Sequence, residues 1–219
     1  DGVCGDVDLC PGFDDNDDAD GDGVPFECEI YGCTDEEAVN FDLDATEENF
    51  TCFYDYEIPY SEGASLISFY VLPDEEDSYP SDEFIGSSFN GDIFAAYALL
   101  AEDQAAYFFE DGSVYGSLSE VDRTSGYWIK LFNPVNAQYT GYRTDPGIEY
   151  SLNASSNLIS FPSDGYSELV DVLPDELDGV VHSILSDNSA ATYIDGIWYG
   201  SLMGLEGFRG YWFKSYEDI

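Results

Sequence analysis

The tetrapeptide LISF stands at residues 66–69 and again at residues 158–161, and this repetition decides the fold of the larger part of the chain. Further matches follow at a constant offset of 84 residues. They are Asp111-Gly112 with Asp195-Gly196, YGSL at 115–118 with 199–202, GYW at 126–128 with 210–212, and Lys130 with Lys214. Such a register indicates an internal duplication. Since the first offset is 92, the first copy carries about eight extra residues, which we place in the loop-like stretch 73–90.

Each copy has the composition of β-structure. Short runs rich in Ile, Phe, Tyr, Val and Ala, such as residues 105–109 and 191–194, are followed by Asp-Gly pairs that suit tight hairpins. We therefore expect a mainly β fold, in which a duplicated β-rich domain with one or two short helices follows an N-terminal segment stabilised in another way.

One segment of the second copy has a helical pattern. Residues 166–173 end at a proline and contain apolar side chains at helical spacing. Leu169, Val170 and Leu173 would share one face of that helix. Residues 82–89 are the expected counterpart in the first copy.

The strongest chemical signal lies near the N-terminus. Residues 18–29 fit the calcium-loop pattern D-x-D-x-D-G-x5-E without a mismatch. Ca²⁺ binds six to eight oxygens at about 2.3–2.6 Å, and alternate residues of a tight loop aim their carboxylates at one centre. Gly23 permits the turn, and we expect calcium to be part of the fold, with a solvated acidic loop as the alternative. The candidate ligands are Asp14, Asn16, Asp18, Asp20, Asp22 and Glu29.

The surroundings of this loop resemble a known family. Prolines on both sides exclude the two helices of an EF-hand. Residues 1–29, with Cys10 before the aspartates and Cys28 after them, resemble a thrombospondin type 3 repeat, although Pro25 and Phe26 depart from its pattern. The resemblance implies calcium ions wrapped by aspartate loops and disulfides in place of a hydrophobic core. The start of the chain resembles the tail of an earlier repeat, which predicts a longer or processed precursor.

Charge dominates the composition. The chain has 47 acidic and 5 basic residues, a net charge of −42, which would repel nucleic acid and anionic membrane surfaces and favours cations as partners. Residues 1–60 hold twenty of the acids and no Lys or Arg, so this region repels itself until metal ions neutralise it. A hydrophobic content of 44% argues against disorder elsewhere. The longest apolar run, residues 93–101, is too short to span a bilayer, and we expect no membrane insertion.

All five cysteines lie within the first 52 residues, where apolar residues are scarce. Disulfides commonly compensate for a missing core in such segments, and they indicate an extracellular or cell-surface location. A zinc site is the weaker alternative, because no histidine lies nearby and the spacings match no common zinc pattern.

A second small module follows. GCTD at residues 32–35, Asn40-Phe-Asp and the closing Cys52 resemble a short disulfide-closed motif of secreted, multi-repeat surface proteins of marine bacteria. The resemblance implies a bond between Cys33 and Cys52, and closing a loop of about twenty residues contributes roughly 3 kcal/mol. We also pair Cys10 with Cys28, which leaves Cys4 for an upstream segment or another chain.

Four side chains of this module are candidates for a second cation: Asp35, Asn40, Asp42 and Asp44. The same residue types also form solvated turns by accepting hydrogen bonds from nearby backbone N–H groups. The sequence leaves both interpretations open.

The duplicated segments resemble a domain of secreted bacterial proteins that carries an NLISFP strand and a terminal GYWxK strand. Residues 157–162 and 210–214 carry the match, whereas the first copy has Tyr70 in place of the proline. The resemblance implies a surface or C-terminal module and no activity.

Catalytic groups are scarce. His182 is the only histidine and lies in a strand-like run, where a structural role suits it better than that of a general base. No nucleophile-elbow, zinc-protease or phosphate-loop motif is present, so we expect no enzymatic activity.

A calcium-dependent carbohydrate-binding module is the alternative function. The 18 Tyr and 3 Trp offer flat faces for sugar rings. Trp128 and Trp212 occupy equivalent positions in the two copies, which favours packing for both. Trp198 has Val114 at its equivalent position and is the candidate for ligand contact.

The leading hypothesis is an extracellular, calcium-binding structural or adhesive protein, in its most specific form a subunit of a surface filament. Its partners would be calcium, further copies of the chain, or a cell-surface or glycan partner. Residues 53–60 are a candidate strand donor to a neighbour, or an ordinary linker. The expected segments are a calcium-binding segment at 1–31, a disulfide-closed motif at 32–57, and β-domain copies at 58–135 and 136–219.

Overall fold

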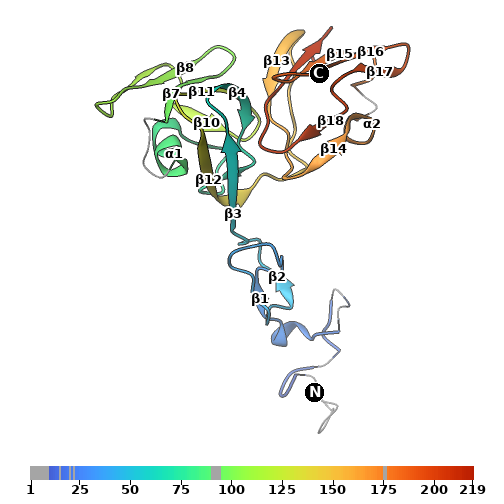
Figure 1. Ribbon diagram of the computed structural model, residues 1–219. Helices are drawn as coiled ribbons and strands as arrows, with labels where there is room; N and C mark the ends of the chain where they lie inside the picture. The colour runs from blue at the N-terminus through green and yellow to red at the C-terminus, as the bar shows by residue number, and fades with distance from the viewer. Residues whose placement is uncertain (1–9, 15, 20, 22, 90–94, 175–176) are drawn as a thin grey trace. The chain divides into compact units, whose positions relative to one another are not determined.

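The computed structural model describes residues 10–14, 16–19, 21, 23–89, 95–174 and 177–219. It divides into two compact units, unit 1 (Asp1–Tyr54) and unit 2 (Asp55–Ile219) (Figure 1). The described residues form nineteen β-strands and two short α-helices. The predicted mainly β fold is therefore confirmed.

The described residues of unit 1 form little regular secondary structure. Phe26–Cys28 forms a 3-10 turn (η2), and Tyr31–Gly32 (β1) pairs in parallel with Glu47–Glu48 (β2). Two disulfides close its loops. Cross-links of this kind are usual where a small segment has too few apolar side chains for a core.

Unit 2 has two halves, residues 55–143 (the first half) and residues 144–219 (the second half). The first half is built on an antiparallel sheet with the strand order β4-β11-β7-β8-β9. Its strands are β4 (Gly63–Ser68), β7 (Ala96–Leu100), β8 (Ala105–Phe108), β9 (Val114–Gly116) and β11 (Gly126–Leu131). On β11, Tyr127, Ile129 and Leu131 are buried and alternate with half-buried residues. This period of two directs one face of the sheet into the core.

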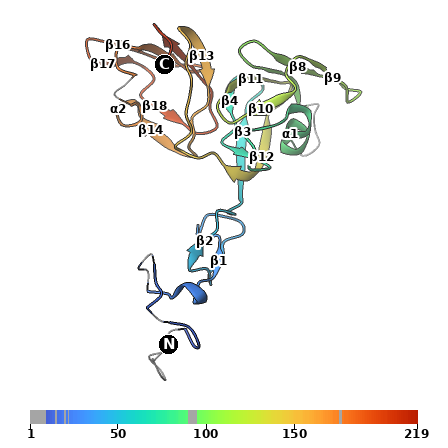
Figure 2. The same ribbon diagram turned by 180° about the vertical axis from the view of Figure 1, so that it is seen from behind.

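The second half repeats this connectivity with the order β13-β19-β15-β16-β17 (Figures 1 and 2). Its strands are β13 (Ser155–Ile159), β15 (Val181–Leu185), β16 (Ala190–Ile194), β17 (Ile197–Gly200) and β19 (Tyr211–Ser215). Each half also has a two-stranded sheet with a helix after its first strand. These elements are β6 (Ser78–Pro80), α1 (Ser81–Ser88) and β10 (Glu120–Asp122), and β14 (Tyr166–Glu168), α2 (Leu169–Val172) and β18 (Gly204–Glu206).

The extra residues of the first half are spread over three places. Strand pairing matches Ser78 with Tyr166, an offset of 88. In the same way, Ala98 of the first half corresponds to Ser183 of the second half, an offset of 85 residues. After the β8–β9 hairpin the offset between equivalent residues is 84. The single insertion predicted in residues 73–90 is therefore replaced by a longer loop before β6, a longer connection from β6 to β7, and one more hairpin residue.

Both Asp-Gly pairs form the hairpin turns that the sequence predicts. Ile194 pairs with Ile197, so Asp195 and Gly196 are the two loop residues, with φ of +50° and +87°. Two successive positive φ values define the turn for which Asp-Gly is preferred. In the longer hairpin of the first half, Gly112 has a φ of +82°.

Both predicted helices are present at the expected places, but the one in the second half is shorter than predicted. α1 covers nearly all of the predicted residues 82–89, whereas α2 has four residues because the preceding three form β14. Leu169 is 2% exposed and Val170 is 73% exposed, so Val170 does not share the buried face. Val172 and Leu173 pack against the core in its place, at the i+3 and i+4 positions from Leu169.

A third sheet in the first half has the order β3-β12-β5. Its strands are β3 (Tyr54–Tyr60), β5 (Val71–Leu72) and β12 (Val135–Arg143). Asn136 and Gln138 of β12 donate side-chain hydrogen bonds to Glu57 of β3. Residues 53–60 are therefore more than a plain linker, because most of this segment is a strand paired within its own chain, although the boundary between the two units lies inside it.

β12 closes the core of the first half. Tyr139 is buried, and its ring stacks against Phe84 at 5.7 Å and Phe208 at 5.6 Å, with Phe69 edge-on at 5.9 Å. The Tyr139 hydroxyl donates a hydrogen bond of 3.3 Å to the hydroxyl of Tyr60, and burial raises the pKa of Tyr60 to about 12. Figure 1 shows β12 beside α1.

One of the few basic side chains is used inside this half. Arg123 is 5% exposed and donates hydrogen bonds to the carbonyl oxygens of Asp74, Glu76 and Tyr142. The buried guanidinium is therefore satisfied by backbone acceptors, and it fixes the longer loop before β6 against β12.

The two halves contact each other through equivalent residues. The N–H of Ser68 donates to the carbonyl oxygen of Phe208 at 3.2 Å, and the N–H of Ser160 donates to that of Thr124 at 2.8 Å. These residues correspond at the offsets of 92 and 84 that the sequence shows. Each contact is thus repeated with the halves exchanged, as in a two-fold dimer interface.

Gly210→Ala tests this close approach. A Cβ at Gly210 would lie 2.7 Å from the carbonyl oxygen of Ile67 and 3.2 Å from the Cα of Gly126, so we expect a loss of about 1–3 kcal/mol in the unfolding free energy of unit 2. Gly165→Ala is the control, because nothing lies within 4 Å of its Cβ position, and it should change stability by less than about 1 kcal/mol. Urea unfolding followed by tryptophan fluorescence measures both. Equal losses in the two variants would contradict the contact.

Candidate metal centre in unit 1

A disulfide brackets the acidic loop. Cys10 and Cys28, 18 residues apart in the sequence, are bonded, which confirms this predicted pair. The predicted ligands from Asp14 to Asp22 lie between them, and Glu29 follows directly. The cross-link limits the freedom of the unfolded chain and so holds mutually repulsive carboxylates in one loop. Cys4 lies outside the described residues.

Asp18, the first residue of the calcium pattern, organises a turn. Its Oδ1 accepts the N–H of Gly21 at 2.7 Å, and its Oδ2 accepts the N–H of Gly23 at 3.1 Å. Both glycines lie in the left-handed region, with φ of +83° and +95°. Gly23 thus makes the turn that the pattern requires at its position. Each carboxylate oxygen has a second lone pair beyond these bonds, so Asp18 is suited to bind a cation as well.

Asp14 forms a second turn upstream. Its Oδ1 accepts hydrogen bonds from the backbone N–H of Asn16 at 3.0 Å and from its Nδ2 at 2.9 Å. The backbone bond is the main cause that lowers the pKa of the Asp14 carboxyl, and the side-chain bond adds to it. The ionised form, which a cation needs, is therefore favoured. At the other end of the loop, the carboxylate of Glu29 accepts a hydrogen bond from the hydroxyl of Tyr31.

The remaining ligands of the pattern, Asp20 and Asp22, lie outside the described residues. Among the described His, Cys, Asp and Glu side chains, one group of three has its ligand atoms within 4.8 Å, and it does not include Asp14, Asp18 or Glu29. All candidate donors are oxygens, which is the ligand chemistry of a hard cation such as Ca²⁺. The donor set fits calcium by its chemistry, and the complete ligand arrangement stays a prediction.

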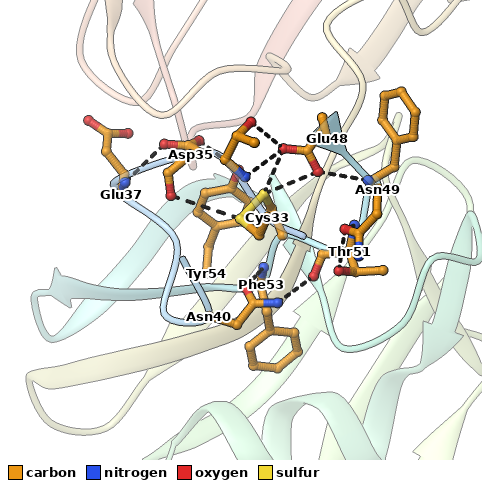
Figure 3. The surroundings of a disulfide bond; sticks show 12 residues. Cys33, Asp35, Glu37, Asn40, Glu48, Asn49, Thr51, Phe53 and Tyr54 are labelled. Carbon is orange, nitrogen blue, oxygen red and sulfur yellow. Dashed lines mark hydrogen bonds between the residues drawn. A yellow bond between two sulfur atoms is a disulfide. The ribbon is translucent and has the colours of Figure 1, made fainter. Parts of the chain in front are cut away.

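The group of three belongs to the second disulfide (Figure 3). Cys33 and Cys52 are bonded, as predicted, and an oxygen of Glu48 lies 3.4 Å from the sulfur of Cys52. Because the two sulfurs are bonded to each other, neither offers a thiolate to a metal ion. We therefore interpret this group as a structural cross-link beside a carboxylate.

Glu48 connects the ends of the second module. Its Oε2 accepts the N–H and the hydroxyl of Thr34 at 2.9 and 2.8 Å, and its Oε1 accepts the N–H of Phe50 at 2.7 Å. The backbone bond from Thr34 is the largest cause that lowers the pKa of Glu48. Sequence analysis missed this residue, since nothing in the sequence distinguishes it from the neighbouring Glu47.

The candidates for a second cation form turns. Asp35 accepts the N–H of Glu37 at 2.9 Å and the hydroxyl of Tyr54 at 2.7 Å (Figure 3). Asp42 accepts the N–H of Asp44 at 3.0 Å. The two bonds from backbone N–H groups are those of Asx turns, which the turn interpretation requires.

Asn40 cross-links two parts of the same module. Its Nδ2 donates to the carbonyl oxygen of Thr51 at 2.7 Å, and its Oδ1 accepts the N–H of Phe53 at 2.7 Å (Figure 3). Both ends of this amide therefore bind backbone next to Cys52, which aligns the strand that leaves the module.

Two residues of unit 2 singled out by the sequence take part in packing. Trp198 on β17 is half-buried against the core of the second half, with its ring 5.2 Å from that of Tyr193. His182 on β15 stacks on Tyr216 at 4.3 Å, and its Nδ1 lies 3.1 Å from the hydroxyl of Ser183.

Comparisons with models of known protein families, with curated proteins and with solved structures found no match. The resemblance of unit 1 to thrombospondin type 3 repeats therefore stays a prediction. Within the described part of the chain, no helix combines the length and the apolar character needed to cross a membrane. The two disulfides are compatible with a secreted or extracellular protein.

Glu48→Gln tests the role of this carboxylate. Because the pKa of Glu48 is lowered in the folded state, its ionised carboxylate stabilises unit 1 at pH values above its ordinary pKa of 4.5. This contribution is lost as the pH falls through the lowered pKa. At pH 7 we expect the variant to reduce the hydrogen-exchange protection of the Thr34 and Phe50 amides about 3- to 10-fold. The reduction should shrink as the wild-type carboxylate is protonated at lower pH.

Glu36→Gln is the matched control, because Glu36 is an exposed glutamate of the same module. It should leave both amides unchanged. A Glu48→Gln effect that does not depend on pH would exclude the charge of Glu48 as its cause.

Proposed function

We propose that this protein is an extracellular structural or adhesive protein in which calcium stiffens the acidic unit 1 and the duplicated β-structure of unit 2 supplies the bulk. Assembly into a surface filament is the most specific form of this proposal. The observation that carries it is the turn around Asp18, inside the loop closed by Cys10 and Cys28, at the first position of a complete calcium-loop pattern.

The charge of unit 1 supports a bound divalent cation. Two carboxylates about 4–5 Å apart repel each other by about 1 kcal/mol in water, and by more where the protein excludes solvent. With no Lys or Arg in residues 1–60, the chain itself supplies no basic side chain there to offset this repulsion. One Ca²⁺ neutralises two charges and coordinates several oxygens at once, so it stabilises the folded loop by its binding free energy.

The composition of unit 2 supports a structural role. Its described residues form sheets of hydrogen-bonded strands, and the only histidine of the chain, His182, is stacked on Tyr216. The extracellular location is supported by the two disulfides, which persist in oxidising surroundings.

Calorimetric titration with calcium tests the metal claim. We expect saturable binding to the full chain at physiological ionic strength, and Asp18→Asn should weaken it by about 10-fold or more because it removes one charged ligand. Asp17→Asn removes the same charge from the adjacent residue, which is not among the ligands of the pattern, and should change the affinity less than about 3-fold. If both variants weaken binding equally, calcium is held only as a diffuse counterion and the proposed site is wrong.

Assembly is tested by electron microscopy of the native protein with calcium and with a chelator. The filament form of the proposal predicts ordered polymers in calcium. Dispersed single molecules under both conditions would contradict it and leave the calcium site to the calorimetric result.

A further inference from the structure

A polar cavity of about 420 Å³ lies in the second half of unit 2. Its described lining comes from β14, from the turn between β15 and β16, from β18 and from the segment that leads into β19. The lining residues used below are Tyr166, Asp187, Asn188, Gly204, Glu206 and Arg209. A cavity of this volume, in which polar side chains from several elements converge, is large enough to enclose a small ligand.

One wall of the cavity differs from the first half by an aromatic ring and a glycine. Tyr166 and Gly204 correspond to Ser78 and Glu120, whose side chains share a hydrogen bond of 3.0 Å in the first half. A Cβ at Gly204 would lie 2.5 Å from Cζ of Tyr166 and 2.6 Å from its hydroxyl oxygen. The glycine thus lets the phenol lie over β18, and the side chain of Tyr166 stays 58% exposed.

Arg209 brings a positive charge to the cavity. It corresponds, at the offset of 84, to Ser125, whose hydroxyl donates a hydrogen bond of 2.8 Å to Asp122. The counterpart of Asp122 is Glu206, and its carboxylate lies 3.6 Å from Nε of Arg209. This distance is too long for a hydrogen bond, so no acceptor among the described residues occupies the N–H groups of the guanidinium.

The turn between β15 and β16 supplies a fixed acceptor. Asp187 is half-buried, and its Oδ1 accepts the N–H of Leu66 at 2.7 Å, a bond that joins the two halves. Burial raises the pKa of Asp187, whereas the bond from Leu66 and the charge of Arg209 oppose this shift. The next residue, Asn188, is exposed and offers both a donor and an acceptor.

The charges around the cavity select against ionic ligands. Asp187 and Glu206 repel an anion, and the net charge of −42 adds to this repulsion. A cation would have to lie close to the guanidinium of Arg209. A neutral polyhydroxyl ligand avoids both costs, because each hydroxyl group can donate to a carboxylate and accept from a guanidinium.

We propose that this cavity binds a neutral sugar unit of a glycan, with a C–H face of the sugar against the ring of Tyr166 and its hydroxyl groups bonded to Asp187 and Arg209. Asn188 would add a further hydrogen bond at the open side. The described lining of the cavity does not include Trp198, so this site differs from the one that the sequence suggests. The inference concerns unit 2 alone and does not depend on calcium binding by unit 1.

An array of neutral and acidic glycans, probed with the full chain in the presence of a chelator, tests the proposal. We expect binding to neutral glycans, and titration of the strongest of them in solution should be saturable. Tyr166→Ala should weaken this binding about 10-fold or more, because it removes the aromatic face. Tyr199→Ala is the matched control, since Tyr199 is 54% exposed in the same half and outside the described lining, and it should leave the affinity within about 2-fold.

Arg209→Met and Lys214→Met form a second pair. Each removes one positive charge from the second half, but Lys214 lies on β19 outside the described lining. Arg209→Met should weaken binding about 10-fold or more, because it removes charged hydrogen-bond donors, and Lys214→Met should leave it within about 2-fold.

Binding of neutral glycans that both Tyr166→Ala and Arg209→Met weaken, and that neither control weakens, supports the proposal. Three results would overturn it: no binding to any neutral glycan, binding to acidic glycans alone, or a variant that binds as its own control does. None of these results bears on the calcium site, because the array is probed without free calcium.

Discussion

The constraint on which the structure depends is an excess of negative charge that basic side chains cannot balance. Forty-seven acidic residues face five basic ones, and one of the five, Arg123, is buried among carbonyl oxygens. Several carboxylates are instead hydrogen-bonded to backbone N–H groups, as Asp18 is to Gly21 and Gly23. A backbone N–H stabilises the ionised carboxylate locally but does not remove its charge. Repulsion between neighbouring loops therefore persists, and it has to be overcome by covalent bonds, bound cations or a core.

The two units meet this constraint by different means. Unit 1 has few buried apolar side chains among its described residues and depends on the Cys10–Cys28 and Cys33–Cys52 disulfides, with calcium as the proposed third contribution. Unit 2 depends on burial, since Phe69, Phe84 and Tyr139 form one aromatic cluster in its first half. The second half has fewer buried side chains in its cluster.

Much of this architecture could be predicted from local signals. The disulfide pairs came from motif resemblances, the hairpins from Asp-Gly pairs, and the shared connectivity from residues repeated at fixed offsets. Features that depend on tertiary contacts could not be predicted. Residues 53–60 have the composition of a strand, but only the fold shows that their partner is β12, about 80 residues later. Val170 fits a helical face by spacing and is exposed because β14 takes the first turn of the expected helix.

The candidate metal centre also has one part that could be predicted from the sequence and one that could not. The calcium pattern could be found in the sequence because it is a local spacing of oxygens, and the turn at Asp18 follows from the same residues. Glu48 could not be found, because its role arises when residues 34 and 50 are brought together around a disulfide. The carbohydrate-binding alternative rested on Trp198, whose ring is partly used in packing against Tyr193.

We propose that unit 1 keeps its structure through a bound divalent cation, whereas unit 2 is stable without one. Residue-resolved hydrogen exchange, measured in calcium and in a chelator at the same ionic strength, distinguishes the two units. We expect protection at the Gly21 and Gly23 amides to fall about 10-fold or more without calcium, whereas protection along β11 should not change. Equal protection of Gly21 and Gly23 in both conditions would contradict it.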